Sequence, residues 1–198
     1  MGSNNLTREE KAKIENELKS IEKQIETIRK KKIELNSRLA EMDVKDYTLK
    51  DRNGKDVKLS EMFGDNKYLF IVHNMGKGCS YCTMWADGFK DTYKEIEKKA
   101  PFVLVSPDEP AVHKEFAELH GWNYPTFSAA GTDFIFDMGY DFIKDGKHNY
   151  WPGVSVFEKS AEGKIKRVAK DYFGPGDFYC NIWHFLDLLP EENITTDS

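Results

Sequence analysis

The sequence predicts an α/β fold in which helices flank a central mixed sheet and one long helix precedes the sheet. Three observations lead to this prediction. A helical heptad pattern fills residues 6–43. Short apolar runs then alternate with segments of helical spacing, which is typical of parallel strands joined by helices. Near the end, two apolar runs flank a Glu-Gly turn and predict an antiparallel pair.

The composition limits the number of domains and the kinds of partner that the chain can have. The 198 residues carry a net charge of −5 and 39% hydrophobic residues, enough for one domain with an appendage. We divide the chain into a helical arm (1–43), a domain (44–190) and a tail (191–198). The sequence has no patch of Lys and Arg interleaved with aromatic residues, so we do not expect it to bind nucleic acid. The start lacks a signal-peptide pattern and no apolar run could span a membrane, so we expect a cytoplasmic protein.

The arm has the spacing of a coiled coil. Between residues 6 and 43 its apolar positions alternate steps of four and three, and Lys32 fills the one seam position that is not apolar. A stripe this narrow favours a homo-oligomer formed through residues 6–43 over the alternative, a helix laid on the domain. The seam consists of Ile14, Leu18, Ile21, Ile25, Ile28, Leu35, Leu39 and Met42.

The first elements of the domain follow from turn and apolar signals. Asn53-Gly54 predicts a hairpin between 47–49 and 57–59. Residues Tyr68 to Val72 form a buried strand, and a helix with an apolar stripe from Cys82 to Ile96 follows it. Phe102 to Val105 reads as the next buried strand.

The second half of the domain completes the pattern. Ser106 is expected to cap the next helix, with Glu109 reaching back, and Gly121 ends that helix. Val154 to Phe157 and Ile165 to Ala169 form the antiparallel pair. A last helix starts near Asp177 and is expected to turn its apolar stripe inward; this stripe consists of Phe178, Ile182, Phe185 and Leu189.

A Cys-x-x-Cys motif, Cys79 and Cys82, opens the helix that follows the buried strand. The N–H groups and dipole of a helix N-terminus stabilise a thiolate there. Cys79 is therefore the expected nucleophile and Cys82 the resolving thiol. The alternatives are two structural cysteines or half of a zinc site. Zinc needs about four ligands, and no second Cys-x-x-Cys or His-x-x-x-His occurs, so we expect neither a metal nor a bound cofactor.

Several segments resemble known families. FVLVSPDEP and the later GWNYPTFSAAGTDFIFDMGY resemble peroxiredoxin-type proteins. GCSYCTMWADGF and WPGVSVF more closely resemble a bacterial thioredoxin-like family of unknown function, often described as similar to alkyl hydroperoxide reductase and thiol-specific antioxidant proteins. The resemblance covers roughly residues 10–190 and agrees with the element order, which is that of the thioredoxin fold.

The candidates for substrate binding are Trp151 and Pro152, from the resemblance, and Trp85 and His73, from their positions beside the cysteine motif. Thioredoxin-like proteins place a cis-proline before the antiparallel pair, facing the cysteines, and here that place is held by Trp151-Pro152; the sequence leaves cis and trans open. Trp85, one turn beyond Cys82, either binds substrate or packs on the sheet. His73 either serves a leaving thiol as a base or is structural. Cys180 reads as a spare cysteine.

One departure from peroxiredoxins directs the functional prediction. Their peroxidatic cysteine lies in Pro-x-x-x-Thr/Ser-x-x-Cys, but Val72 and Gly76 stand at the Pro and Thr/Ser places before Cys79. We therefore expect a thiol–disulfide oxidoreductase that acts on a protein or small-molecule disulfide and needs a reducing partner. The alternatives are a weak thiol peroxidase and a redox-inert scaffold assembled through the arm.

Overall fold

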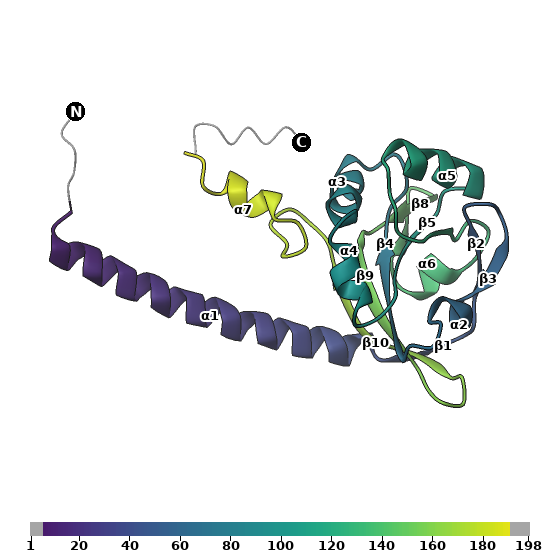
Figure 1. Cartoon of the computed structure of the whole chain (residues 1–198), viewed down its shortest axis with the longest axis horizontal. Coiled ribbons are helices and arrows are strands. Elements are labelled where there is room, and N and C mark those ends of the chain that lie inside the picture. The colour runs from purple at the N-terminus through teal and green to yellow at the C-terminus, as the bar shows by residue number, and fades with distance from the viewer. Residues whose placement is uncertain (1–5, 191–198) are drawn as a thin grey trace.

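The computed structural model describes residues 6–190, so the predicted tail at 191–198 lies outside the described residues. The first element is the predicted long helix, α1 (Arg8–Ala40), which projects away from the rest of the chain (Figure 1). Thr7 and Glu10 form a capping box at its start: the Thr7 hydroxyl accepts from the Glu10 N–H, and the Glu10 carboxylate accepts from the Thr7 N–H. No helix in the described part is long and apolar enough to cross a membrane.

An eight-stranded mixed sheet forms the centre of the domain, in the order β1-β10-β9-β4-β5-β6-β2-β3. β4, β5 and β6 are parallel, and β9 and β10 form the predicted antiparallel pair beside β4. The strands are β1 (Met42–Val44), β2 (Thr48–Asp51), β3 (Asp56–Lys58), β4 (Tyr68–His73), β5 (Phe102–Ser106), β6 (Thr126–Ser128), β9 (Gly153–Lys159) and β10 (Ile165–Tyr172).

Helices lie on both sides of this sheet (Figure 1). They are α2 (Leu59–Met62), α3 (Ser80–Phe89), α4 (Tyr93–Glu97), α5 (Pro110–Leu119) and α6 (Phe134–Asp137). The last helix, α7 (Ile182–Leu186), lies away from the sheet, beyond α3 (Figure 1). A separate hairpin, which the sequence did not predict, consists of β7 (Asp141–Lys144) and β8 (Lys147–Tyr150). The architecture is an α/β thioredoxin-like fold behind a long helix, as predicted.

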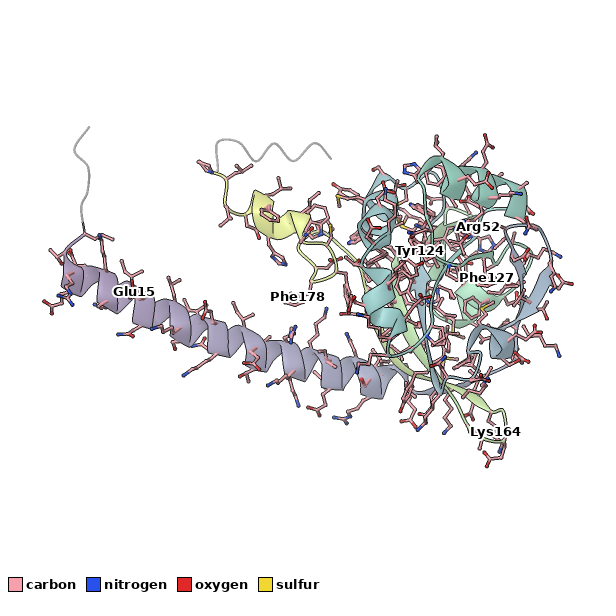
Figure 2. The ribbon with its side chains drawn as sticks, in the orientation of Figure 1. Glu15, Arg52, Tyr124, Phe127, Lys164 and Phe178 are labelled. Carbon is pink, nitrogen blue, oxygen red and sulfur yellow. A yellow bond between two sulfur atoms is a disulfide. The ribbon has the colours of Figure 1, made fainter. Side chains whose placement is uncertain are left out.

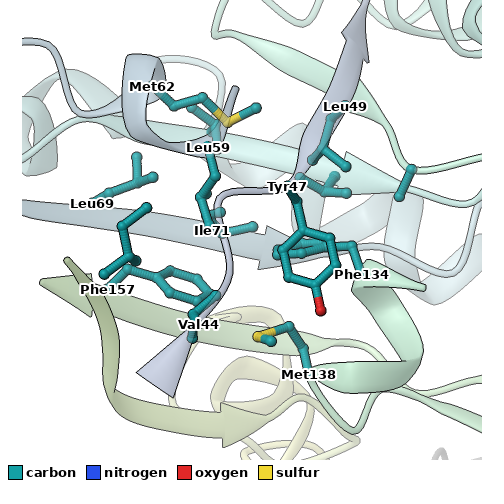
Figure 3. Close-up of a cluster of buried hydrophobic side chains, with 14 of the residues drawn as sticks. Val44, Tyr47, Leu49, Leu59, Met62, Leu69, Ile71, Phe134, Met138 and Phe157 are labelled. Carbon is teal, nitrogen blue, oxygen red and sulfur yellow. The ribbon is translucent and has the colours of Figure 1, made fainter. Parts of the chain in front are cut away.

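Two apolar clusters lie on opposite faces of the sheet. Successive strand side chains point to opposite faces, and β4 divides in this way. Leu69 and Ile71 belong to the cluster shown in Figure 3, together with Phe157. Val72 belongs to the other cluster, which contains the cysteine helix. The cysteine helix therefore packs on one face of the sheet only, the face that carries Val72.

The cysteine helix is shorter than predicted. The single helix expected from Cys82 to Ile96 is two helices, α3 and α4, separated at residues 90–92. The Lys90 N–H donates to the Asp87 carbonyl, a bond across three residues that tightens the last turn and ends the α-helical ladder. The apolar stripe itself is confirmed, because Cys82, Trp85 and Tyr93 are all buried.

The predicted cap at Ser106 is wrong. Ser106 is the last residue of β5, and the N-cap of α5 is Glu109, which makes no side-chain capping bond. The Ser106 hydroxyl instead pairs with His113 at 2.6 Å. A buried hydroxyl has to find a partner within the protein, and here that partner is a histidine one turn into α5.

The inward packing predicted for the last helix is also wrong. α7 is a short helix, and the four stripe residues Phe178, Ile182, Phe185 and Leu189 are 54%, 42%, 67% and 44% exposed. Trp183 faces the domain in their place, with its ring 5.7 Å from that of Tyr81. The Asp177 carboxylate accepts the N–H groups of Tyr179 and Cys180, which turns the chain before a helix can start there.

The end of α1 is part of the domain. Ala40 is fully buried, and its carbonyl accepts from Arg167 Nε at 3.0 Å. Lys32 Nζ lies 2.7 Å from an Asp171 carboxylate oxygen, and the Asn36 side chain donates to the same carboxylate. The arm therefore has two parts, a free length and a final section held against β10.

Candidate functional site

Cys79 lies where β4 passes into α3. β4 ends beside β5, and the Asn74 N–H donates to the Val105 carbonyl at 2.9 Å. After a short loop, Cys79 occupies the N-cap of α3, half-buried, and its Sγ accepts the Cys82 N–H at 3.1 Å. A sulfur at an N-cap takes up a hydrogen bond that the helix cannot satisfy itself, and it sits at the positive end of the helix dipole. Both effects favour the thiolate form of Cys79.

Cys82 lies one turn further along, on the inner side of α3. It is 2% exposed, and its Cα is 5.2 Å from that of Cys79. This separation is within the range that a disulfide requires, and the two sulfur atoms lie close enough to form that disulfide. Cys79 is thus the reachable sulfur, and Cys82 is covered.

Asn74 fixes the loop before the cysteines. Its side-chain carbonyl accepts the Gly76 N–H at 2.7 Å, and its Nδ2 contacts the Cys82 carbonyl at 3.4 Å. Asn74 is itself only 6% exposed. One buried amide therefore ties the end of β4, the loop and the cysteine helix together.

Asp108 holds the same loop from the end of β5. One carboxylate oxygen accepts the Lys77 N–H at 2.7 Å. Gly76 has φ +97°, and a Cβ built there would lie 2.8 Å from the other oxygen of Asp108. Only glycine fits this conformation and this contact. Burial raises the pKa of Asp108, while the Lys77 N–H and charge act in the opposite direction.

A buried serine–histidine pair stands behind Asp108. The Ser106 hydroxyl accepts the Asp108 N–H at 3.3 Å and lies 2.6 Å from His113 Nδ1. His113 is 3% exposed, and its Nε2 has no partner among residues 6–190. Burial and the charge of Arg52 lower the pKa of His113 to about 4, so the ring is neutral at pH 7.

Trp151 and Pro152 lie at the same edge of the sheet. Gly153 pairs with His73 across β9 and β4, which brings Pro152 next to the end of β4 where the cysteine loop begins. Pro152 is buried. Residues 6–190 contain no cis peptide bond, so the Trp151–Pro152 bond, which the sequence left open as cis or trans, is trans. Trp151 is 50% exposed and stacks on Phe142 at 5.0 Å. It offers an aromatic surface at this edge.

His73 is not part of this site. Its ring stacks on Tyr140 at 3.8 Å, and its Nε2 lies 3.0 Å from the Ser155 hydroxyl, both on the sheet face opposite the cysteines. Burial, with the charges of Arg167 and Lys170, lowers the pKa of His73 well below its usual value. The proposal that His73 serves the leaving thiol or the substrate is therefore wrong.

Trp85 supports the cysteine helix from inside. It is 3% exposed and packs against Phe173 and Trp183 at ring distances of 5.5 and 6.2 Å. A side chain covered in this way offers no surface to a substrate, so the packing interpretation replaces the binding one. Cys180 is buried in the same apolar cluster as Cys82.

Asn74 and Asp108 are the two residues of this site that the sequence prediction missed. A usable signal was present, because each follows a predicted buried strand within three residues. The carboxyl ends of parallel strands meet at one sheet edge, which predicts that both lie beside the cysteine loop. Within residues 6–190, no three side chains of His, Cys, Asp or Glu are grouped so that they could hold a metal ion.

The fold defines the class of protein: this is a thioredoxin-fold protein of peroxiredoxin-like architecture. Similar solved structures agree with this class. A cysteine-to-serine mutant of PrxQ from Xylella fastidiosa superposes with a TM-score of 0.59 at 13% identity, covering 75% of this chain and 94% of that one. Peroxidoxin BcpB of Mycobacterium tuberculosis has a TM-score of 0.56 at 23% identity, with coverage of 67% and 84%. AhpC of Enterococcus faecalis has a TM-score of 0.55 at 16% identity, with coverage of 70% and 83%.

The sequence itself identifies the family. Residues 3–194 match the family described as bacterial protein of unknown function (DUF899), and the chain belongs to it. This family agrees with the resemblance seen in the cysteine motif. A search of curated proteins gave no match.

Proposed function

We propose that this protein is a thiol–disulfide oxidoreductase. The observation that carries the proposal is the asymmetry of the cysteine pair: Cys79 is half-buried at the N-cap of α3 and accepts an N–H bond, whereas Cys82 is 2% exposed behind it. A reactive outer thiolate and a protected inner thiol are what a two-step exchange reaction needs.

The reaction balances with a disulfide as the oxidant. The Cys79 thiolate attacks one sulfur of the substrate disulfide, forming a mixed disulfide and releasing the other half as a thiolate. The Cys82 thiol then gives up its proton and attacks Cys79 Sγ, which releases the second half. The substrate has gained two electrons, and the protein holds a Cys79–Cys82 disulfide. A thiol reductant must return those two electrons before the next cycle.

The surrounding residues position this chemistry. Asn74 and Asp108 fix the loop through bonds to Gly76 and Lys77, so that the Cys79 sulfur is presented at a fixed place. Trp151 supplies an exposed aromatic ring at the same sheet edge, suited to the apolar part of a disulfide substrate. No bound cofactor enters the reaction.

Reduction of a peroxide is the second candidate, supported by the peroxiredoxin-like architecture. At the position where peroxiredoxins carry a Thr or Ser hydroxyl, this chain has Gly76, whose N–H is already bound to Asn74. The donor that would polarise a peroxide is missing, so we assign peroxide reduction a minor role at most.

The arm serves assembly. Its apolar seam is exposed from Ile14 to Leu39, and an exposed apolar stripe of this length marks an interaction surface. The predicted last seam residue, Met42, is not part of α1: it lies in β1 and packs against the core. Removal of residues 1–30 leaves Lys32, Asn36 and Ala40 on the domain and should lower the oligomeric state, as measured by light scattering, while the domain stays folded. The redox-inert scaffold remains the rival function, because an arm of this kind can work without the cysteines.

A redox titration separates the two functions. The chain is equilibrated in glutathione or dithiothreitol buffers of graded potential, free thiols are alkylated, and the cysteine peptides are quantified by mass spectrometry. We expect Cys79 and Cys82 to change together as one two-electron couple within the range of cytosolic thiol buffers, with Cys180 unchanged. A pair that stays reduced or stays oxidised throughout that range would leave the scaffold function as the better account.

A further inference from the structure

α1 exposes an apolar stripe that nothing within residues 6–190 covers. Its seven Ile and Leu side chains are 42% to 72% exposed, and Figure 2 shows the side chains of the projecting part of α1 with no other segment packed against them. The stripe consists of Ile14, Leu18, Ile21, Ile25, Ile28, Leu35 and Leu39. A contiguous line of this kind marks an interface.

We propose that two copies of this chain pair through α1 as an antiparallel coiled coil, in which Ile14 of one copy lies opposite Leu39 of the other. The inference rests on the assembly role given to the arm above and goes beyond it, because it fixes the partner, the orientation and the register. It does not depend on the redox chemistry.

The spacing of the seam fits this register. The seam has two kinds of position: those followed by a step of four residues to the next seam position, and those followed by a step of three. In an antiparallel coiled coil, a position of one kind faces a position of the other kind. Placing Ile14 opposite Leu39 does this for the whole seam: it also places Leu18 opposite Leu35 and Ile25 opposite Ile28. Every apolar seam position from 14 to 39 then has a counterpart, and only Ile21 meets the polar Lys32.

The charges of α1 favour the same orientation. Residues 14–26 contain four glutamates and two lysines, whereas residues 27–39 contain five lysines or arginines and one glutamate. Antiparallel pairing sets the acidic half of each arm beside the basic half of the other. Parallel pairing would set the two basic halves side by side, and like charges along a seam oppose association.

Lys32 provides an independent argument. In a parallel pair, the two Lys32 residues would share one layer of the seam, with two ammonium groups facing each other. In the antiparallel register they are separated by 11 positions, about 16 Å along the helix. Each Lys32 Nζ can then keep its 2.7 Å contact with Asp171 of its own domain, which already draws it to the edge of the seam.

Single-cysteine cross-linking tests the orientation. The variants Ile14→Cys and Leu39→Cys are made in a background carrying Cys79→Ala, Cys82→Ala and Cys180→Ala, and fold is checked by circular dichroism. We expect a disulfide-linked dimer when the two variants are mixed and oxidised, and none from either variant alone, since equal positions near the ends lie about 37 Å apart. Asn16→Cys, on the outer side of the helix, is the control and should not link to Leu39→Cys.

The unaltered chain supplies the second measurement. Light scattering should give twice the 22.9 kDa mass of one chain. Amine cross-linking of a mixture of light and ¹⁵N-labelled protein should give no link between the Lys13 residues of two copies. A Lys13–Lys13 link, a self-linked single-cysteine variant or a threefold mass would overturn the antiparallel dimer and leave arm-mediated assembly intact. A mass of one chain would overturn both, without bearing on the redox function.

Discussion

The two faces of the central sheet differ in how completely they are packed. On one face Leu69, Ile71 and Phe157 have no exposed surface at all. On the other, which carries the cysteine helix, Phe70 and Val154 are only half-buried beside an apolar cavity of about 190 Å³. The first face is therefore closed throughout, whereas the second gives up part of its packing beside the end of α1, where Ile33, Asn36 and Ser37 line the cavity.

The largest expected effect concerns the cysteines and should appear in activity alone. Cys79→Ser should abolish disulfide exchange and trap no intermediate, whereas Cys82→Ser should accumulate a mixed disulfide on Cys79, because nothing remains to displace the product. Mass spectrometry of the intact protein measures both. Urea unfolding should show little change in stability. Cys180→Ala is the control, and faster alkylation of Cys180 than of Cys79 would contradict the assignment.

Peroxide turnover should be low by comparison with disulfide exchange. A missing preorganised donor typically costs about 10²–10³ in rate, and the Gly76 position offers none. Consumption of hydrogen peroxide with a thiol reductant supplied should therefore lie well below that of efficient thiol peroxidases. Rates equal to theirs would mean that another group replaces the hydroxyl, and the preference for exchange would be lost.

Truncation on the two faces should separate their contributions to stability. Leu69→Ala on the closed face should lower the free energy of unfolding by about 2–5 kcal/mol, as in other well-packed cores. Val154→Ala, which is half-buried beside the cavity, should cost about 1 kcal/mol, since little buried area is lost. Urea unfolding measures both, and equal costs would remove the distinction between the faces.

The loop on the cysteine side should be sensitive at Gly76. Gly76→Ala places a Cβ against Asp108 in addition to the positive φ, whereas Gly163→Ala has φ +81° and open space around it. We expect Gly76→Ala to destabilise by roughly 1–3 kcal/mol more than the control, the usual cost of overpacking. In an Asp108→Ala background this excess should disappear. An excess that persists would place the strain in the backbone alone.

The pH dependence contributed by His113 is the one expected effect that vanishes at neutral pH. Its folded pKa of about 4 lies below the unfolded value of 6.5, so the unfolded state binds a proton first as the pH falls. The stability that His113 contributes is full above pH 6.5 and is lost progressively toward pH 4, by roughly 2 kcal/mol at pH 5. His113→Gln should flatten this part of the curve. The buried His73 acts in the same direction, so a slope should remain.

Much of the fold could be predicted because local pattern and final structure agree. The apolar run of β4 followed by a Cys-x-x-Cys predicted both the strand and the helix start, and Asn53-Gly54 predicted the β2–β3 hairpin. These signals are local: turn chemistry and side-chain period act within a few residues. The last residues of α1 show the limit, since the contact of Ala40 with Arg167 joins positions far apart in the chain.

The errors at His73 and at the last helix share one cause: hydrophobic periodicity shows which face of an element is apolar, but not which segment packs on that face. His73 follows Val72 by one residue, and this single step moves its side chain to the other side of the sheet. The stripe that includes Phe178 and Phe185 has helical spacing, yet Trp183 takes the contact with α3. Asp108 was missed for a different reason: its place after β5 puts it at the right sheet edge, but its role depends on contacts with Gly76 and Lys77 in a loop far away in the sequence.

The contact between Gly76 and Asp108 has a consequence for how this family can change. A threonine at position 76, the residue that peroxiredoxin chemistry would require there, meets both a left-handed backbone and a carboxylate at 2.8 Å. One substitution cannot introduce it, because the loop path and Asp108 would have to change first. Each of the two residues thus preserves the other, and related sequences that lose Gly76 should be those that have already lost Asp108.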